Sequence, residues 1–137
     1  MPSVFSRIVA GEIPCAKIWE DEEFLAFLDI MPVAPGHTLV IPKKDVDYLF
    51  DLDEGTYQRL MAACRTVAAG LKQATRCKRV CVVVLGFEVP HAHVHLIPLD
   101  TLQQFPFPPR KQPAPEGLMA TAERIRASFK KNGKGGH

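Results

Sequence analysis

Three histidines alternate with apolar residues in the segment 90–98, which reads PHAHVHLIP. Successive side chains of an extended strand point to opposite faces. We therefore expect a strand with His91, His93 and His95 on one face and Ala92, Val94 and Leu96 on the other. The three imidazoles would stand roughly 7 Å apart along that face. Because the whole chain has 5 histidines, this clustering indicates a reaction centre or a metal site rather than an ordinary solvated strand face.

Size and composition favour one cored domain. With 137 residues, 47% of them hydrophobic, we expect a single domain over residues 1–137. The net charge of +2, without a long basic stripe, argues against nucleic acid as a partner. No apolar run approaches the roughly 20 residues of a membrane-spanning helix, and the N-terminus lacks the pattern of a secretory signal. We therefore expect a cytoplasmic protein with no membrane partner, in which the 4 cysteines are reduced.

Hydrophobic periodicity and turn residues divide the first hundred residues into short elements. The expected elements are a helix over 4–10 capped by Ser3, a hairpin of strands 16–19 and 24–29, a strand over 37–41, a long helix over 54–74 capped by Asp53, and a strand over 79–85 before the histidine strand. The unbroken apolar run of strand 79–85 predicts burial on both of its faces. Short links between strands favour an α+β fold, with a mainly antiparallel sheet and the helices against one face.

The C-terminal third has a different pattern. Five prolines between positions 106 and 115 predict an extended connector over about 103–115. An amphipathic helix is expected over about 116–130, followed by a flexible basic tail over 131–137. The core of the domain is therefore expected within about residues 3–98.

The histidine row can support two kinds of chemistry. A neutral imidazole is a good nucleophile toward phosphorus, because one ring nitrogen keeps its lone pair while the other carries the proton. Such an attack would form a covalent phosphohistidine-type intermediate. The rival is a metal-dependent enzyme, since His-x-His on a strand can chelate zinc, iron or manganese. A metal shell usually adds a carboxylate or another histidine; Glu88 is the nearest acid, and Asp29 and His37 lie elsewhere in the chain.

Two separated segments together resemble the histidine-triad superfamily. The stretch HAHVHLI at 91–97 is similar to its signature of three histidines separated by hydrophobic residues, and FLDIMPVAPGHTLVIPK at 27–43 is similar to its upstream half. The likeness covers about residues 3–98 and looks closest to the small, bacterial-type Hint-like branch. The resemblance implies a histidine-triad-like fold with a five-stranded sheet, two such sheets joined across a homodimer, and neither a cofactor nor a metal.

The resemblance also implies a nucleotidyl hydrolase or transferase. Its substrate would be a purine nucleotide, either a nucleoside phosphoramidate or a dinucleoside polyphosphate, attacked at the α-phosphate. By position in the motif, His93 would be the nucleophile and His95 would contact the phosphate and the leaving group. His91 and His37 would form an orienting relay behind the nucleophile. Asp29 would accept hydrogen bonds from the ribose hydroxyls, and the base would be walled by Phe5, Ile8, Phe27 and Ile30.

The loop before the triad departs from the family pattern. Many relatives carry an Asn-x-Gly loop and a glutamine there, whereas this chain reads VVLGFEVP at 83–90. Backbone amides near Gly86 and Glu88 would still face the phosphate, with less help from polar side chains. A nucleotide-binding sensor or scaffold that has lost turnover is therefore a further alternative. Ser3 and Ser6 stand where some bacterial relatives hold zinc with Cys-x-x-Cys, so no zinc is expected there.

Overall fold

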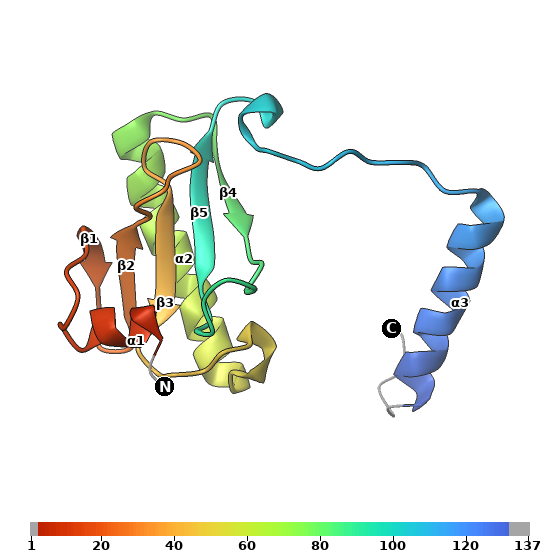
Figure 1. Ribbon diagram of the computed structural model, residues 1–137, viewed down its shortest axis with the longest axis horizontal. Coiled ribbons are helices and arrows are strands. Elements are labelled where there is room, and N and C mark those ends of the chain that lie inside the picture. Colours follow the sequence, from red (N-terminus) through yellow and green to blue (C-terminus); the bar gives the residue numbers. More distant parts are fainter. Residues whose placement is uncertain (1–2, 132–137) are drawn as a thin grey trace. The chain divides into compact units, whose positions relative to one another are not determined.

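The computed structural model of the protein describes residues 3–131, without the side chains of residues 130 and 131. Contacts divide the chain into two compact units, Met1–Pro106 and Phe107–His137. The first unit contains the sheet and both histidine-bearing segments, and the second contains the C-terminal helix (Figure 1). The basic tail predicted over 131–137 lies outside the described residues, apart from the backbone of its first residue.

Five antiparallel strands form one sheet in the first unit (Figure 1), which confirms the α+β class and the sheet that the family resemblance implied. The strands are β1 (Lys17–Glu20), β2 (Phe24–Leu28), β3 (Thr38–Pro42), β4 (Arg79–Val83) and β5 (Val94–Leu99). Their order across the sheet is β1-β2-β3-β5-β4. Strands β1 and β4 are therefore the edges. Strands β3 and β5 lie inside the sheet; His37 directly precedes β3, and the three triad histidines lie at the start of β5.

The long helix α2 (Glu54–Thr75) covers one face of the sheet (Figure 1). Asp53 caps it as predicted, because its side chain accepts a hydrogen bond of 3.1 Å from the amide of Thr56 and so satisfies one of the amides that a helix start leaves unpaired. The apolar stripe of α2 and the facing strand residues share one core. Its members include Leu60, Ala63, Cys64, Val67 and Leu71 from the helix and Phe24, Ala26, Val40, Val94 and Leu96 from the sheet.

The short helix α1 (Val4–Val9), which Ser3 caps, packs on the other face of the sheet. Phe5 of this helix is buried in a second core that also contains Leu25, Phe27, Leu39 and Ile41. The prediction that the helices share one face is therefore wrong. Strands β2 and β3 are apolar on both faces, and because side chains alternate along a strand, each face needs its own cover.

The edge strand β4 is more exposed than its sequence predicts. Within the strand Val82 is 54% exposed, and Val84 and Leu85 just beyond the strand are 38% and 65% exposed. The expected burial on both faces is wrong: among the described residues β4 pairs only with β5, which makes it an edge strand that less of the protein covers. An apolar run is typical of a central strand, but it does not distinguish a central strand from an edge that another surface covers.

The remaining helices are short or lie in the second unit. Two 3-10 helices occupy Leu49–Asp51 and Leu102–Gln104. In the second unit, an irregular proline-rich stretch leads into α3 (Pro115–Lys131), close to the helix expected over 116–130. Among the described residues, no helix is both long enough and apolar enough to cross a membrane.

Candidate active site

The three triad histidines lie where the chain enters β5, and only His95 lies within the strand. The expectation of a continuous strand is wrong at its start, because the amide of His91 turns back to the carbonyl of Val89 at 2.8 Å. Val94 and Leu96 point into the core beneath α2. His95 therefore lies on the opposite face, the one that carries α1.

A backbone hydrogen bond fixes the orientation of the His93 ring. Its Nδ1 lies 2.6 Å from the carbonyl oxygen of His91, and since a carbonyl can only accept, Nδ1 must carry a proton. In the neutral ring, Nε2 then keeps its lone pair. Among the described residues this Nε2 has no hydrogen-bond partner and is not fully buried, although the residue as a whole is only 6% exposed. His93 thus presents a nucleophilic nitrogen at the surface of an otherwise buried ring.

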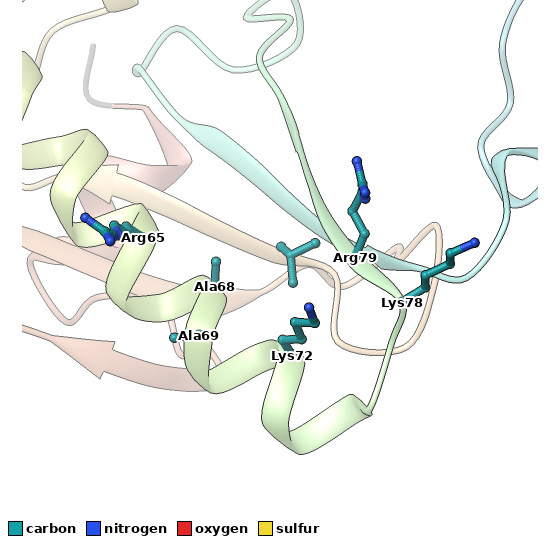
Figure 2. Close-up of a pocket in the computed structure, with 7 residues that line it drawn as sticks. Arg65, Ala68, Ala69, Lys72, Lys78 and Arg79 are labelled. Atoms are coloured by element: carbon teal, nitrogen blue, oxygen red, sulfur yellow. The ribbon is translucent and has the colours of Figure 1, made fainter.

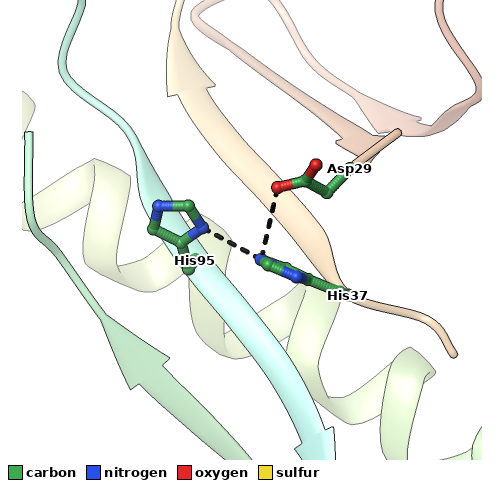
Figure 3. A group of neighbouring side chains, drawn as sticks. All are labelled: Asp29, His37 and His95. Carbon is green, nitrogen blue, oxygen red and sulfur yellow. Dashed lines mark hydrogen bonds and ion pairs between the residues drawn. The ribbon is translucent and has the colours of Figure 1, made fainter. Parts of the chain in front are cut away.

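His37 and His95 form a second pair with defined tautomers (Figure 3). The amide of Val33 donates to Nδ1 of His37 at 3.0 Å, so that nitrogen is the acceptor and Nε2 carries the proton. Nε2 of His37 lies 2.9 Å from Nδ1 of His95. His37 therefore donates to His95, whose own proton is then on Nε2. The result is an outward N–H donor on His95 beside the free lone pair of His93, with the two ring centroids 5.1 Å apart.

A carboxylate completes this group from the end of β2. An oxygen of Asp29 lies 3.5 Å from Nε2 of His37 (Figure 3), while its other oxygen accepts the amide of Met31 at 2.8 Å. Burial lowers the pKa of His37, against an opposing effect of Asp29. Burial, followed by the neighbouring His93 and His37, lowers the pKa of His95 to about 4. Both rings are therefore neutral at pH 7, which agrees with the tautomers that their hydrogen bonds require.

His91 lies away from this pair, on the α1 side of the triad. Its Nε2 donates to the carbonyl of Pro42 at 2.7 Å, and its Nδ1 then accepts from the hydroxyls of Ser3 and Ser6 at 3.4 and 3.3 Å. Asp45 approaches the same nitrogen at 3.5 Å. The structure therefore does not join His91 and His37 in a relay. His91 is fully buried, and it acts on His93 through its backbone carbonyl.

The residues expected to wall a base are divided by the structure. Phe5 lies edge-on to His93, with the ring centroids 5.0 Å apart, and edge-on to Phe27 at 5.5 Å. Ile8 packs partly buried against the same core. Phe5 therefore lies beside His93, and Phe27 and Ile8 belong to the core that surrounds Phe5. Ile30 is 94% exposed on the loop after β2 and is not part of that cluster.

The loop before the triad is largely exposed. Gly86 has φ +77, a backbone conformation that favours glycine, and the neighbouring Phe87 is 94% exposed. Glu88 is also exposed. No hydrogen bond ties Gly86 or Glu88 to the histidines among the described residues, and the expectation that backbone amides near them face a phosphate stays a prediction.

The loop that holds His37 depends on a second glycine. Gly36 has φ +89, and a Cβ atom there would lie 3.0 Å from Thr75 and 3.2 Å from Pro98. The close approach brings the loop against the end of α2 and against β5. It therefore helps to position His37 directly beside His95.

The same residues also offer a possible cation site. One ligand atom each from Asp29, His37 and His95 lies within 4.8 Å of the others (Figure 3). Asp29 and His37 lie far from the triad in the sequence, but the fold brings both of them to His95. An ion bound here would replace the hydrogen bond between the two rings, since both nitrogens of that bond would have to become ligands.

Sequence reasoning missed the backbone groups that set the tautomers. The amide of Val33 and the carbonyls of Pro42 and His91 decide which nitrogen of each ring is free. Main-chain partners leave no side-chain signal in a sequence. Asp45, which lies near the same nitrogen of His91 as Ser3 and Ser6, was also missed. Its position just after β3 was the one signal in the sequence that could have indicated it.

The chain is similar to a known family over most of its length. A family model described as the HIT domain matches residues 10–102. An uncharacterized 13.2 kDa HIT-like protein of Azospirillum brasilense is 42% identical in an alignment 101 residues long, which covers 69% of this chain and 83% of that protein.

Solved structures give the same result. A Streptococcus mutans protein superimposes with a TM-score of 0.80 at 36% identity, covering 92% of this chain and 84% of that one. A hypothetical histidine triad nucleotide-binding protein of Sulfolobus tokodaii has a TM-score of 0.68 at 32% identity, covering 93% and 91% of the two chains.

Proposed function

The chain belongs to the HIT domain family, and from this membership and the geometry of its site we propose that it is a nucleotidyl hydrolase or transferase that works through a covalent adduct on His93. The observation that carries the proposal is the bond of 2.6 Å from Nδ1 of His93 to the carbonyl of His91. This bond leaves the lone pair of Nε2 available, as a nucleophile toward phosphorus requires.

The proposed substrate is a purine nucleoside phosphoramidate or a dinucleoside polyphosphate. Nε2 of His93 attacks the α-phosphorus, and the bond from phosphorus to the leaving group breaks with its electron pair going to that group. An amine leaving group also takes a proton from water. A water molecule then attacks the phosphorus and loses a proton to solvent, the N–P bond breaks, and its electron pair returns to His93. The product is a nucleoside monophosphate.

The neighbouring residues have supporting roles in this proposal. His95 donates from Nε2 to a phosphate oxygen or to the leaving group, because its Nδ1 is occupied by His37. Asp29 accepts hydrogen bonds from the ribose hydroxyls with the oxygen that faces His37. Phe5 and Phe27 support the side of the site where the base would lie.

Turnover by single-residue variants tests the proposal. His93→Ala should lose turnover of an adenosine phosphoramidate by about a thousandfold or more, as expected for loss of a covalent nucleophile, while still binding adenosine monophosphate. His95→Asn keeps an acceptor for His37 and should lose about a hundredfold, because it removes one donor to the developing charge. Undiminished turnover by His93→Ala contradicts the proposal. Nucleotide binding without any turnover by the wild type would instead support the sensor alternative.

A metal-dependent enzyme is the second candidate, and the grouping of Asp29, His37 and His95 favours it. An ion held by these residues would compete with the His37–His95 hydrogen bond. The purified protein would then contain stoichiometric metal, and a chelator would abolish its activity. Activity in protein shown to be metal-free excludes this candidate.

We also propose that the protein is a homodimer whose sheets join at β4. The outer edge of β4 is unpaired in the described part of the chain, and an apolar edge strand tends to pair with another strand. Val82, Val84 and Leu85 offer apolar side chains there. Sedimentation of the wild type and of Val82→Lys distinguishes the states: the wild type should be a dimer and the variant should dissociate more readily.

A further inference from the structure

Positive charge is concentrated in one part of the chain. Residues 55–87 contain six Lys and Arg residues and no Asp or Glu, whereas the whole protein has a net charge of only +2. The six are Arg59, Arg65, Lys72, Arg76, Lys78 and Arg79. They are spread over a helix, a turn and the start of a strand, so no basic stripe is visible in the sequence. The fold brings four of them together.

These four cations line one groove between α2 and the start of β4. Figure 2 shows Arg65 and Lys72 on the helix, and Lys78 and Arg79 on the opposite wall. The groove has a volume of about 330 Å³, which is in the range of sites for small ligands.

The spacing along α2 explains why the groove is open. Arg65 and Lys72 are separated by two helical turns and therefore lie on the same side of the helix. Ala68 and Ala69 stand between them on that side. The methyl groups of these alanines do not fill the space between Arg65 and Lys72. They form the bottom of the groove. Val80 of β4 closes the groove on the sheet side.

The groove cations have no carboxylate partners among the described residues. Elsewhere in the first unit, Lys17, Lys43 and Arg59 each form an ion pair with a glutamate. Near the groove, Asp100 binds the backbone amide of Lys78 at 2.9 Å rather than its ammonium group. Four unpaired like charges around one groove repel each other, and a bound polyanion would relieve that repulsion.

The groove is separate from the histidine site. It lies on the α2 face of the sheet, where Val80 packs against the core beneath the helix. His93 and His95 are on the face that carries α1. A ligand in the groove therefore cannot be the substrate that His93 attacks.

We propose that this groove binds a short phosphate chain, as found in inorganic oligophosphate or in the triphosphate of a free nucleotide. Arginine guanidinium groups pair with phosphate oxygens in two-pronged contacts, and lysines add point charge. Residues 80–87, which follow Arg79, carry no charge, so the basic surface ends at the start of β4. The groove therefore suits a short anion rather than the long backbone of a nucleic acid.

Binding of inorganic tripolyphosphate to the full chain tests this site. Nuclear magnetic resonance should show shifts of the amides of Ala68, Ala69 and Val80, at low ionic strength where surface charges are least screened. ATP should shift the same amides, and adenosine should not. Equal shifts by ATP and tripolyphosphate would indicate that the groove recognises the phosphate chain. Tighter binding of ATP at the same amides would indicate that the groove also contacts the base.

Two charge-matched variants complete the experiment. Lys72→Gln with Arg79→Gln should weaken tripolyphosphate binding roughly tenfold or more, because two charge-assisted contacts are lost. Arg7→Gln with Lys17→Gln removes the same charge from α1 and β1 and should change binding less than about twofold. If the first variant fails to fold, Arg65→Gln alone serves in its place.

Three results would overturn the proposal. The first is shifts confined to residues 91–95, which would place the anion at the histidines. The second is equal weakening by both double variants, which would mean only a general charge effect. The third is tighter binding of a single-stranded oligonucleotide than of tripolyphosphate at the groove amides, which would make the groove a nucleic-acid surface.

Discussion

Replacement of His95 by asparagine should flatten the dependence of stability on pH between about 4 and 6.5. Burial is the main cause that lowers the pKa of His95 from 6.5 to about 4. The unfolded chain therefore takes up a proton near pH 6.5, and the folded protein does so only near pH 4. The unfolded state therefore binds more protons than the folded state in this window. As a result, the contribution of neutral His95 to the free energy of unfolding is complete above pH 6.5 and is lost as the pH falls toward 4.

The size of the effect follows from the same shift. At about 1.36 kcal/mol per pKa unit, the difference corresponds to at most roughly 3 kcal/mol. Solvent screening of a partly exposed ring reduces this value, and we expect about 2 kcal/mol. His37 contributes in the same direction, because burial lowers its pKa as well.

Urea unfolding at about pH 7 and about pH 4.5 measures the effect. Between these two pH values, the free energy of unfolding of the wild type should fall by about 2 kcal/mol more than that of His95→Asn. Asparagine does not titrate, and it still offers an acceptor to His37. Carboxylates contribute to both proteins and cancel in the comparison. His137→Gln, a change outside the described residues, is the control and should behave like the wild type. Equal losses by the wild type and His95→Asn would refute the reasoning.

Four further substitutions test the loop at Gly36, with a helical control, the cap of α2 and the ribose contact. Gly36→Ala should destabilise the protein by about 2 kcal/mol, because its φ of +89 and the 3.0 Å approach to Thr75 leave no room for a side chain; the exposed helical change Gly70→Ala should instead stabilise it by up to about 1 kcal/mol, and equal urea midpoints would contradict both. Asp53→Ala removes the cap of α2 and should cost about 1 kcal/mol in urea unfolding, so an unchanged midpoint would count against the cap. Asp29→Asn should raise KM about tenfold for a ribonucleotide substrate but not for its dideoxy analogue, and an equal rise for both would exclude the ribose contact.

The features predictable from sequence are those with a local cause. Ser3 and Asp53 cap helices because their own side chains bond the amides three residues ahead, which is visible in a short window of sequence. Alternation likewise placed Val94 and Leu96 in the core and His95 on the other face. These determinants depend on chain geometry and not on what packs nearby.

The features that escaped prediction depend on distant parts of the chain. The apolar run of β4 does not reveal whether a second neighbour covers the strand, so its edge position was missed. The tautomer of His37 depends on the amide of Val33, and that of His91 on the carbonyl of Pro42. The basic groove joins Arg65 to Arg79 across a turn. Such contacts appear only when the elements are assembled.

The central claim is that His93 forms a covalent bond to the nucleotide. Intact-mass analysis of reactions that are stopped rapidly without acid tests this claim directly. The wild type mixed with an adenosine phosphoramidate should gain the mass of one adenylyl group, which is adenosine monophosphate less one water, and peptide mapping should place the added mass on His93. The His93→Ala protein should show no such species. Turnover by the wild type without any adduct, or an adduct on another residue, would contradict the account.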